Sequence, residues 1–178
     1  MKFIIHGGTL SRSLQSISSV VPSGRTMPIL LNFLMEVENE ELKITASDLE
    51  TTITVKLNPS MLEQDQVNKI AIPAKMFLEV VNSLSSQQIT VEVKENYSVE
   101  ITAGTGRYKL VGEDPASYPT AIELSDPALT TISSSVLVKA IGKTLFATGT
   151  GEMRPQMTGV LCEQTHNETI FVATDAHK

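Results

Sequence analysis

Hydrophobic and polar residues follow helical spacing in two parts of the first 122 residues. In residues 10–21 the leucine, isoleucine and valine side chains recur every three or four positions, which predicts an amphipathic helix with Thr9 as its N-cap. A second helix is predicted to begin at Pro73, because proline is favoured in a first turn. Its apolar stripe includes Phe77, Val81 and Leu84.

Most of the remaining apolar residues stand in short, nearly alternating runs between turn residues, a pattern typical of strands. A turn at Glu38–Glu41 separates two of these runs. The predicted strands cover residues 2–5, 29–37, 42–48, 51–57, 69–72, 88–93, 98–103 and 107–112. Many strands with two helices predict an α+β fold with a largely antiparallel sheet.

The chain also repeats itself. A shift of 127 positions aligns Leu10 with Leu137, Pro28 with Pro155 and their neighbours without a gap. The second copy has a helical stripe at residues 137–145 with Ser135 as a possible cap, then a strand at 156–164, a turn and another strand. The other identical pairs are Gly24 with Gly151, Leu34 with Leu161, Glu36 with Glu163, Glu41 with Glu168, Ala46 with Ala173 and Asp48 with Asp175.

So long a period is typical of a duplicated domain rather than of a solenoid. We expect a first domain at residues 1–122, a linker at 123–128 and the beginning of a second domain at 129–178. The second copy covers only about 50 residues, so we expect this sequence to be a fragment.

The composition, with 41% hydrophobic and 4% aromatic residues, predicts a globular protein whose core is mainly aliphatic. No stretch approaches the roughly 20 apolar residues of a membrane span, so no membrane association is expected. A single cysteine, Cys162, excludes an intrachain disulfide and favours a cytoplasmic location.

The charges are unevenly distributed. The net charge is −6, yet residues 1–35 and 127–151 contain no aspartate or glutamate. Arg12 and Lys139 occupy equivalent helix positions in the two copies, and Lys143 follows one turn later. Lys75 lies in the first turn of the second helix, and Arg25 in the loop after the first.

A cationic surface of this kind would bind phosphates without reading bases. Because its helices have no interleaved aromatic residues, duplex backbone contact is favoured over stacking on single strands. A merely solvated helix face remains the alternative for any one lysine.

Little in the sequence favours catalysis, a cofactor or a metal. His6 has no second histidine or cysteine nearby, and Glu50 falls on His177 in the other copy, so Asp48 and Glu50 do not recur as a carboxylate pair. Asp48 and Asp175 are instead expected to cap turns. Cys162 is expected to be a buried thiol. A hydrolase using His6, Asp48 and Glu50, or an interaction module without DNA, stays open as an alternative.

Three segments carry a family resemblance: residues 28–32 (PILLN), 45–50 (TASDLE) and 173–178 (ATDAHK). Together with residues 70–81, 107–119 and 158–164 they resemble the bacterial sliding clamp, the beta subunit of DNA polymerase III. The resemblance implies a chain of three similar domains, the third absent here, that pairs head-to-tail into a homodimeric ring. Helices would line the hole, and sheets would form the outside.

Such a ring is a processivity factor without a catalytic site or cofactor. The implied partners are double-stranded DNA, the replicative polymerase, the clamp loader and other proteins with a clamp-binding motif. By resemblance, DNA contact is assigned to Arg25, Arg154, Arg12, Lys75, Lys139 and Lys143. Part of a partner-peptide pocket is assigned to Met157, Thr174, Ala176, His177 and Lys178, where family members often have Gly and Arg in place of Ala176 and Lys178.

Overall fold

The structure is a computed structural model of residues 1–178, and it describes all of them except 25–26, 64–66, 120–128, 152 and 166. The chain divides into two compact units, Met1–Glu123 and Leu124–Lys178. Each unit is described by itself below. Within the described residues, none of the helices has the length and the apolar sequence of a membrane-spanning helix.

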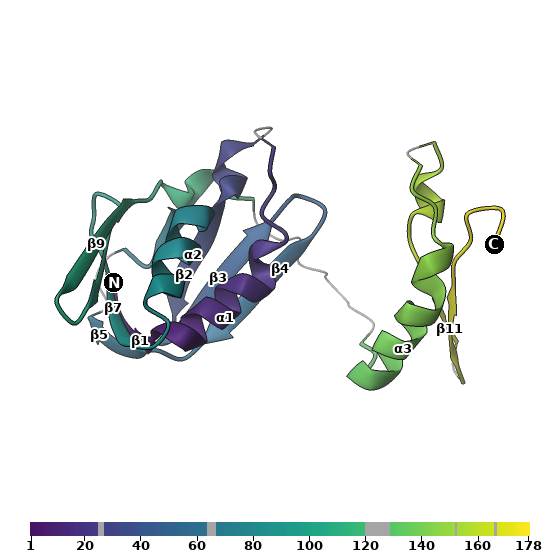
Figure 1. Cartoon of the computed structure of the whole chain (residues 1–178), viewed down its shortest axis with the longest axis horizontal. Coiled ribbons are helices and arrows are strands. Elements are labelled where there is room, and N and C mark those ends of the chain that lie inside the picture. Colours follow the sequence, from purple (N-terminus) through teal and green to yellow (C-terminus); the bar gives the residue numbers. More distant parts are fainter. Residues whose placement is uncertain (25–26, 64–66, 120–128, 152, 166) are drawn as a thin grey trace. The chain divides into compact units, whose positions relative to one another are not determined.

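Unit 1 combines two sheets with two α-helices (Figure 1). Short 3-10 helices at Pro28–Leu31 and Pro115–Ser117 complete it. Its strands and helices are β1 (Lys2–His6), α1 (Gly7–Ser18), β2 (Asn32–Glu38), β3 (Glu41–Ser47), β4 (Thr52–Leu57), β5 (Ser60–Glu63), β6 (Lys69–Pro73), α2 (Ala74–Ser83), β7 (Gln88–Val93), β8 (Ser98–Ala103) and β9 (Gly106–Val111).

All strand pairings in the two sheets of unit 1 are antiparallel. One sheet has the order β5-β1-β7-β8-β9, and the other has the order β4-β3-β2-β6. The β2–β3 turn has positive φ at both Asn39 and Glu40, as a two-residue hairpin turn requires. The predicted turn at Glu38–Glu41 and the predicted α+β class with antiparallel sheets are therefore confirmed.

A single core joins both sheets to both helices. Leu10, Leu14 and Ile17 of α1 are fully buried, as are Phe77 and Val81 of α2. They pack with the inward residues of the strands, and the opposite helix faces stay in solvent. Burying each such side chain contributes about 1.5–3 kcal/mol, so the core fixes which helix faces remain free.

The start of α1 differs from the prediction. The helix begins at Gly7, and the N-cap is His6, whose Nδ1 accepts a hydrogen bond from the Gly8 amide at 3.2 Å, so Thr9 is not the cap. A Cβ on Gly7 would lie 2.2 Å from the Leu84 carbonyl oxygen. The close approach of α1 to the end of α2 therefore requires glycine at this position.

Three other boundaries also differ. The residues Pro28–Leu31 form a 3-10 helix, so β2 begins only at Asn32. Pro73 is the N-cap of α2 rather than a residue of its first turn. The strand β5, which pairs with β1 in antiparallel orientation, was not predicted.

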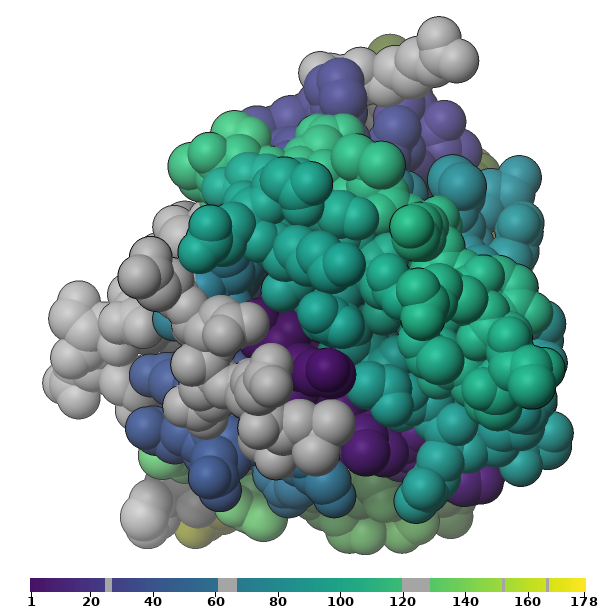
Figure 2. All heavy atoms as spheres, turned by 90° about the vertical axis from the view of Figure 1, so that its left-hand side faces the viewer, coloured from purple at the N-terminus to yellow at the C-terminus, as the bar shows by residue number. Residues whose placement is uncertain are grey.

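The N-terminus of unit 1 is held inside the structure. Met1 is 1% exposed, and its ammonium group donates a hydrogen bond to the Val93 carbonyl at 3.2 Å. Figure 2 shows the purple N-terminal segment lying against teal atoms of later parts of the chain.

A second, smaller cluster of buried hydrophobic residues lies apart from the main core of unit 1. It contains Ile29, Leu30, Ala71 and Tyr118.

Unit 2 repeats the beginning of unit 1. Its α3 (Ser134–Thr144), the 3-10 helix Pro155–Met157, β10 (Leu161–Gln164) and β11 (Thr169–Val172) follow in the same order as α1, Pro28–Leu31, β2 and β3. The helix N-caps, His6 and Ser133, are also 127 residues apart. Ser133 rather than Ser135 is therefore the cap, although its hydroxyl caps no backbone amide.

The two units differ in burial. Among the described residues of 129–178, only Ala147 is buried. Cys162, at the position of the fully buried Met35, is exposed, so the prediction of a buried thiol is wrong. In unit 1, α2 and a second sheet complete the core around Met35, whereas the described part of unit 2 has one α-helix and two strands.

Candidate nucleic-acid interface and peptide pocket

Most lysines and arginines on or beside the two sheets of unit 1 pair with neighbouring carboxylates. Lys43 lies 2.5 Å from Glu38, and Lys69 lies 2.5 Å from Glu36. The further pairs are Lys2 with Glu92, Lys56 with Glu41, and Lys94 and Arg107 with Glu100. These lysines and arginines therefore have little charge left for an external anion.

The cations predicted to contact DNA behave differently. Within the described residues, none of them lies within ion-pair distance of a carboxylate, and all are exposed: Arg12, Lys75, Lys139, Lys143 and Arg154. Arg25 lies outside the described residues. Lys109 of β9 is the remaining described cation without an ion pair.

Each unpaired helix cation sits opposite the apolar stripe of its helix. In α1, Arg12 follows the buried Ser11, and its Nε donates to the Gly8 carbonyl at 3.2 Å, which leaves the terminal guanidinium nitrogens free among the described residues. In α3, Lys139 and Lys143 are one turn apart on one face. The hydrophobic periodicity thus fixes where the cations point.

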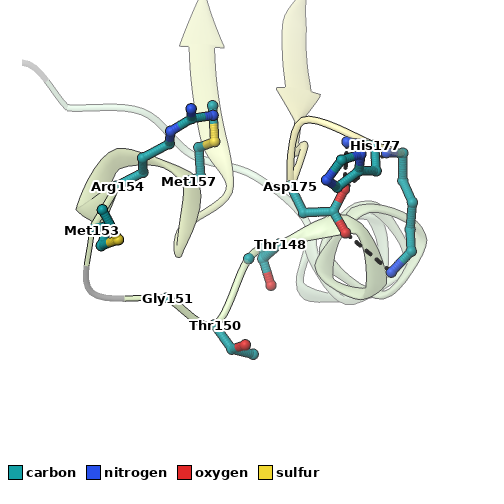
Figure 3. Close-up of a pocket in the computed structure, with 10 residues that line it drawn as sticks. Thr148, Thr150, Gly151, Met153, Arg154, Met157, Asp175 and His177 are labelled. Atoms are coloured by element: carbon teal, nitrogen blue, oxygen red, sulfur yellow. Dashed lines mark hydrogen bonds and ion pairs between the residues drawn. The ribbon is translucent and has the colours of Figure 1, made fainter.

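Unit 2 contains a hollow of about 480 Å³ between the loop after α3 and the end of the chain (Figure 3). Arg154 and Met157 lie on one side of it, and Asp175 and His177 lie on the other. The remaining lining residues are Thr148, Gly149, Thr150, Gly151, Met153 and Lys178. The hollow combines two methionine side chains with Arg154, His177 and the Lys178–Asp175 ion pair, so it suits a ligand with apolar and polar groups.

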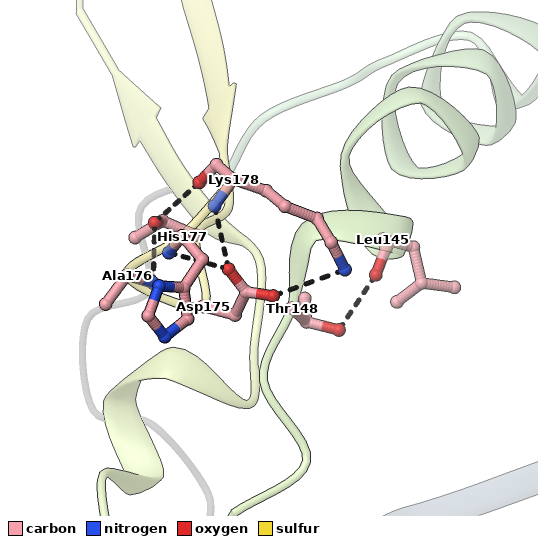
Figure 4. A network of polar contacts seen from close by, with 7 residues as sticks. Leu145, Thr148, Asp175, Ala176, His177 and Lys178 are labelled. Atoms are coloured by element: carbon pink, nitrogen blue, oxygen red, sulfur yellow. Dashed lines mark hydrogen bonds and ion pairs between the residues drawn. The ribbon is translucent and has the colours of Figure 1, made fainter.

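A turn centred on Asp175 shapes one wall of this hollow (Figure 4). The Asp175 Oδ1 accepts hydrogen bonds from the backbone amides of His177 at 2.9 Å and Lys178 at 2.8 Å, and Oδ2 lies 3.2 Å from Lys178 Nζ. These donors, led by the His177 amide, lower the pKa of Asp175 to about 2. The carboxylate is therefore charged at neutral pH and holds the turn.

The same turn recurs in unit 1. The Asp48 Oδ1 accepts from the amides of Glu50 at 3.0 Å and Thr51 at 2.6 Å. The residue after each aspartate has positive φ, 81° at Leu49 and 75° at Ala176. The prediction that both aspartates cap turns is confirmed.

The residues assigned to the pocket by resemblance divide into two groups. Met157, His177 and Lys178 line the hollow, together with Arg154, which was assigned to DNA contact. Thr174 and Ala176 do not line it but form the turn, where the Thr174 hydroxyl accepts from the Ala176 amide at 3.0 Å and donates to the Lys178 carbonyl at 2.8 Å.

Besides Arg154, six lining residues were not assigned to the pocket from the sequence, namely Thr148, Gly149, Thr150, Gly151, Met153 and Asp175. The Gly149 amide donates to the Met157 carbonyl at 2.7 Å, which brings the glycine loop against the 3-10 helix. The glycines of this segment predict a loop, but they do not indicate which other part of the chain the loop packs against.

Two side chains considered for catalysis accept hydrogen bonds that hold the local backbone. His6 caps α1 through Nδ1, and Asp48 holds its turn through Oδ1. Among the described residues, no three histidine, cysteine, aspartate or glutamate side chains come together as metal ligands.

Comparisons with known proteins match almost the whole chain to one protein family. A family model described as DNA polymerase III beta subunit, N-terminal domain, matches residues 1–122, and the model of the central domain of that subunit matches residues 131–178. The Beta sliding clamp of Staphylococcus aureus is 28% identical over 183 residues, covering 100% of this chain and 48% of that protein.

Solved structures give the same result. The DNA polymerase III subunit beta from Pseudomonas aeruginosa and the DNA polymerase sliding clamp from Bacillus subtilis each have 29% identity and a TM-score of 0.89, with 99% of this chain and 48% of theirs covered. A Pseudomonas aeruginosa sliding clamp bound to griselimycin has a TM-score of 0.88 at 29% identity and covers 99% of this chain and 47% of its own. The chain thus spans about half the length of these relatives.

Proposed function

The chain belongs to the DNA polymerase III beta subunit family, and on this premise we propose that it is the N-terminal part of a DNA sliding clamp. The complete protein would be a homodimeric ring of six domains, three from each chain, around duplex DNA. It would hold the replicative polymerase on its template as a processivity factor without catalysing a reaction itself.

One observation carries this proposal. Among the described lysines and arginines, six of the seven with an ion pair lie on or beside the strands of unit 1, whereas those without one lie on helices and loops, except Lys109. An exposed cation without a carboxylate neighbour can neutralise a phosphate and release a counterion. The assigned DNA contacts are Arg12, Lys75, Lys139 and Lys143, with Arg25 and Arg154 from the loops.

The hollow in unit 2 is proposed as part of a partner-peptide pocket. Met157, His177, Lys178 and Arg154 would contact the peptide, and Thr174 and Ala176 would shape the wall. The partners would be the polymerase, the clamp loader and other proteins with a clamp-binding motif. The relative bound to griselimycin supports ligand docking in this family. Lys178 provides a single ammonium where a planar guanidinium is frequent, so we expect weaker bidentate contacts.

Retention on DNA tests the proposal directly. The full-length protein that carries residues 1–178 would be loaded onto nicked circular plasmid, and half of the sample would then be linearised before gel filtration. A ring stays with the circle and slides off the linear ends. Equal retention on both forms, or equal loss from both, would contradict encirclement.

The rival functions predict different results. A hydrolase using Asp48 loses turnover in Asp48→Asn, whereas the clamp only loses part of a turn. An interaction module without DNA would show no salt-dependent association with duplex DNA.

A further inference from the structure

A polar network joins the two helices of unit 1 at their exposed junction. The Ser11 hydroxyl of α1 donates a 2.5 Å hydrogen bond to Asn82 Oδ1 of α2. The Gln15 Nε2 donates to the same oxygen at 3.1 Å and to the Ser11 hydroxyl at 3.3 Å. Ser11 is 6% exposed, so the network is anchored in the protein interior.

Two donors, the Ser11 hydroxyl and Gln15 Nε2, converge on the Asn82 Oδ1 in this network. The Asn82 Nδ2 is therefore the amide atom that remains free to donate elsewhere. Asn82 itself is exposed, and its Nδ2 has no acceptor among the described residues. Two oriented N–H donors therefore remain available at the surface.

The surroundings favour an anion as the acceptor. Arg12 directly follows Ser11 on α1, and Lys75 lies two helical turns before Asn82 on the same face of α2. Glu79, one turn before Asn82, is the exposed acid of this helix face. The exposed face of α1 carries no acid, and its Arg12 directly follows the Ser11 that bonds Asn82.

We propose that Asn82 is a phosphate-contact residue, whose Nδ2 donates to a phosphodiester oxygen of duplex DNA. Ser11 and Gln15 are positioning residues that hold the amide, and Arg12 supplies the neighbouring charge. This inference rests on the proposed function and adds a neutral contact to its cationic ones. The contact belongs to unit 1 alone, because Val138 and Gly142 replace Ser11 and Gln15 at the 127-residue offset.

The dependence of DNA affinity on salt separates this role from a purely structural one. A labelled 30-base-pair duplex is titrated with the 178-residue chain at several NaCl concentrations, and fluorescence anisotropy gives the dissociation constant. A neutral donor releases no counterion, so Asn82→Ala should weaken binding about threefold to tenfold with an unchanged slope of log K against log salt. Arg12→Gln should reduce the slope by about 0.9.

Two further variants control for folding and net charge. Asn82→Asp keeps Oδ1 as an acceptor for Ser11 and Gln15 but replaces the donor by a negative oxygen, so it should weaken binding by about tenfold. Asn96→Asp, in the β7–β8 turn, adds the same charge at an exposed asparagine and should change binding less than about twofold. Thermal unfolding verifies that each variant is folded.

The outcomes are decisive in each case. Wild-type affinity in both Asn82 variants, while Arg12→Gln weakens binding, overturns the role of Asn82 and leaves the clamp proposal intact. An equal loss of DNA affinity in Asn82→Asp and Asn96→Asp would mean that the added negative charge alone weakens binding, and it would also overturn the role of Asn82. Absence of salt-dependent binding by the wild-type chain contradicts DNA contact by this surface altogether.

Discussion

The separation of paired from unpaired cations makes a quantitative prediction for unit 1. Replacing Arg12 and Lys75 by glutamine removes two charges from helix residues without ion pairs. Replacing Lys43 and Lys69 by glutamine removes two charges that Glu38 and Glu36 already neutralise. Both double variants have the same net charge, so only the location of the lost charges differs.

Counterion release sets the expected size of the effect. Each phosphate contact contributes about 0.9 to the negative slope of log K against log salt, so losing Arg12 and Lys75 should reduce the slope by about 1.8. Between 50 and 200 mM NaCl this amounts to about a 12-fold smaller decrease of affinity than in the wild type. The control pair Lys43 and Lys69 should leave the slope unchanged.

The assay is fluorescence anisotropy with duplex DNA at five salt concentrations, where non-specific dissociation constants of roughly 10⁻⁴–10⁻⁶ M are expected. Removing Lys75 from the first turn of α2 should stabilise that helix slightly, because a cation is unfavourable there. Thermal unfolding checks that the loss of the Arg12–Gly8 hydrogen bond leaves the double variant folded. Identical slopes in the two double variants would refute the distinction between helix and sheet cations.

Three further predictions concern stability and titration. Gly7→Ala should destabilise unit 1 by about 1–3 kcal/mol, because its Cβ would meet the Leu84 backbone, whereas Gly142→Ala, with open space around it, should stabilise α3 by about 0.5–1 kcal/mol; urea unfolding followed by circular dichroism distinguishes them. Burial raises the pKa of Tyr118 to about 12, so its neutral form stabilises the fold fully below about pH 10, and this contribution is lost as the pH rises towards 12. Tyr118→Phe should therefore remove up to about 2.7 kcal/mol of the decrease in unfolding free energy between about pH 10 and 12. The same dependence of stability on alkaline pH in this variant and the wild type would contradict the prediction. The Asp175 turn, with a pKa of about 2, contributes stability above the ordinary pKa and should lose it only as the pH falls towards 2; a carboxyl resonance that titrates near the ordinary 3.8 would contradict this.

The order of elements was predictable because it depends on local spacing. Apolar residues three or four positions apart give α1 and α3, and the 127-residue offset places the same elements in both units. Turns at Asp48 and Asp175 were also predictable, since an aspartate bonds its own backbone two residues on. These signals need no knowledge of distant residues.

Features made by distant residues were not predictable. The start of α1 at Gly7 depends on Leu84 and Gln87, about 80 residues away, because only glycine fits against those carbonyls. The exposure of Cys162 depends on which elements cover its sheet. Arg154 lies with His177 in one hollow because a 3-10 helix and a turn meet there.

The amino-acid sequence by itself determined the repeated α+β plan, the acid-free cationic segments and the family, because each is recorded in spacing and residue type along the chain. Only the tertiary structure decided which cations are neutralised and where the Asn82 amide points. Ion pairs and hydrogen bonds form between groups brought together by folding, and their partners cannot be identified from neighbours in the sequence.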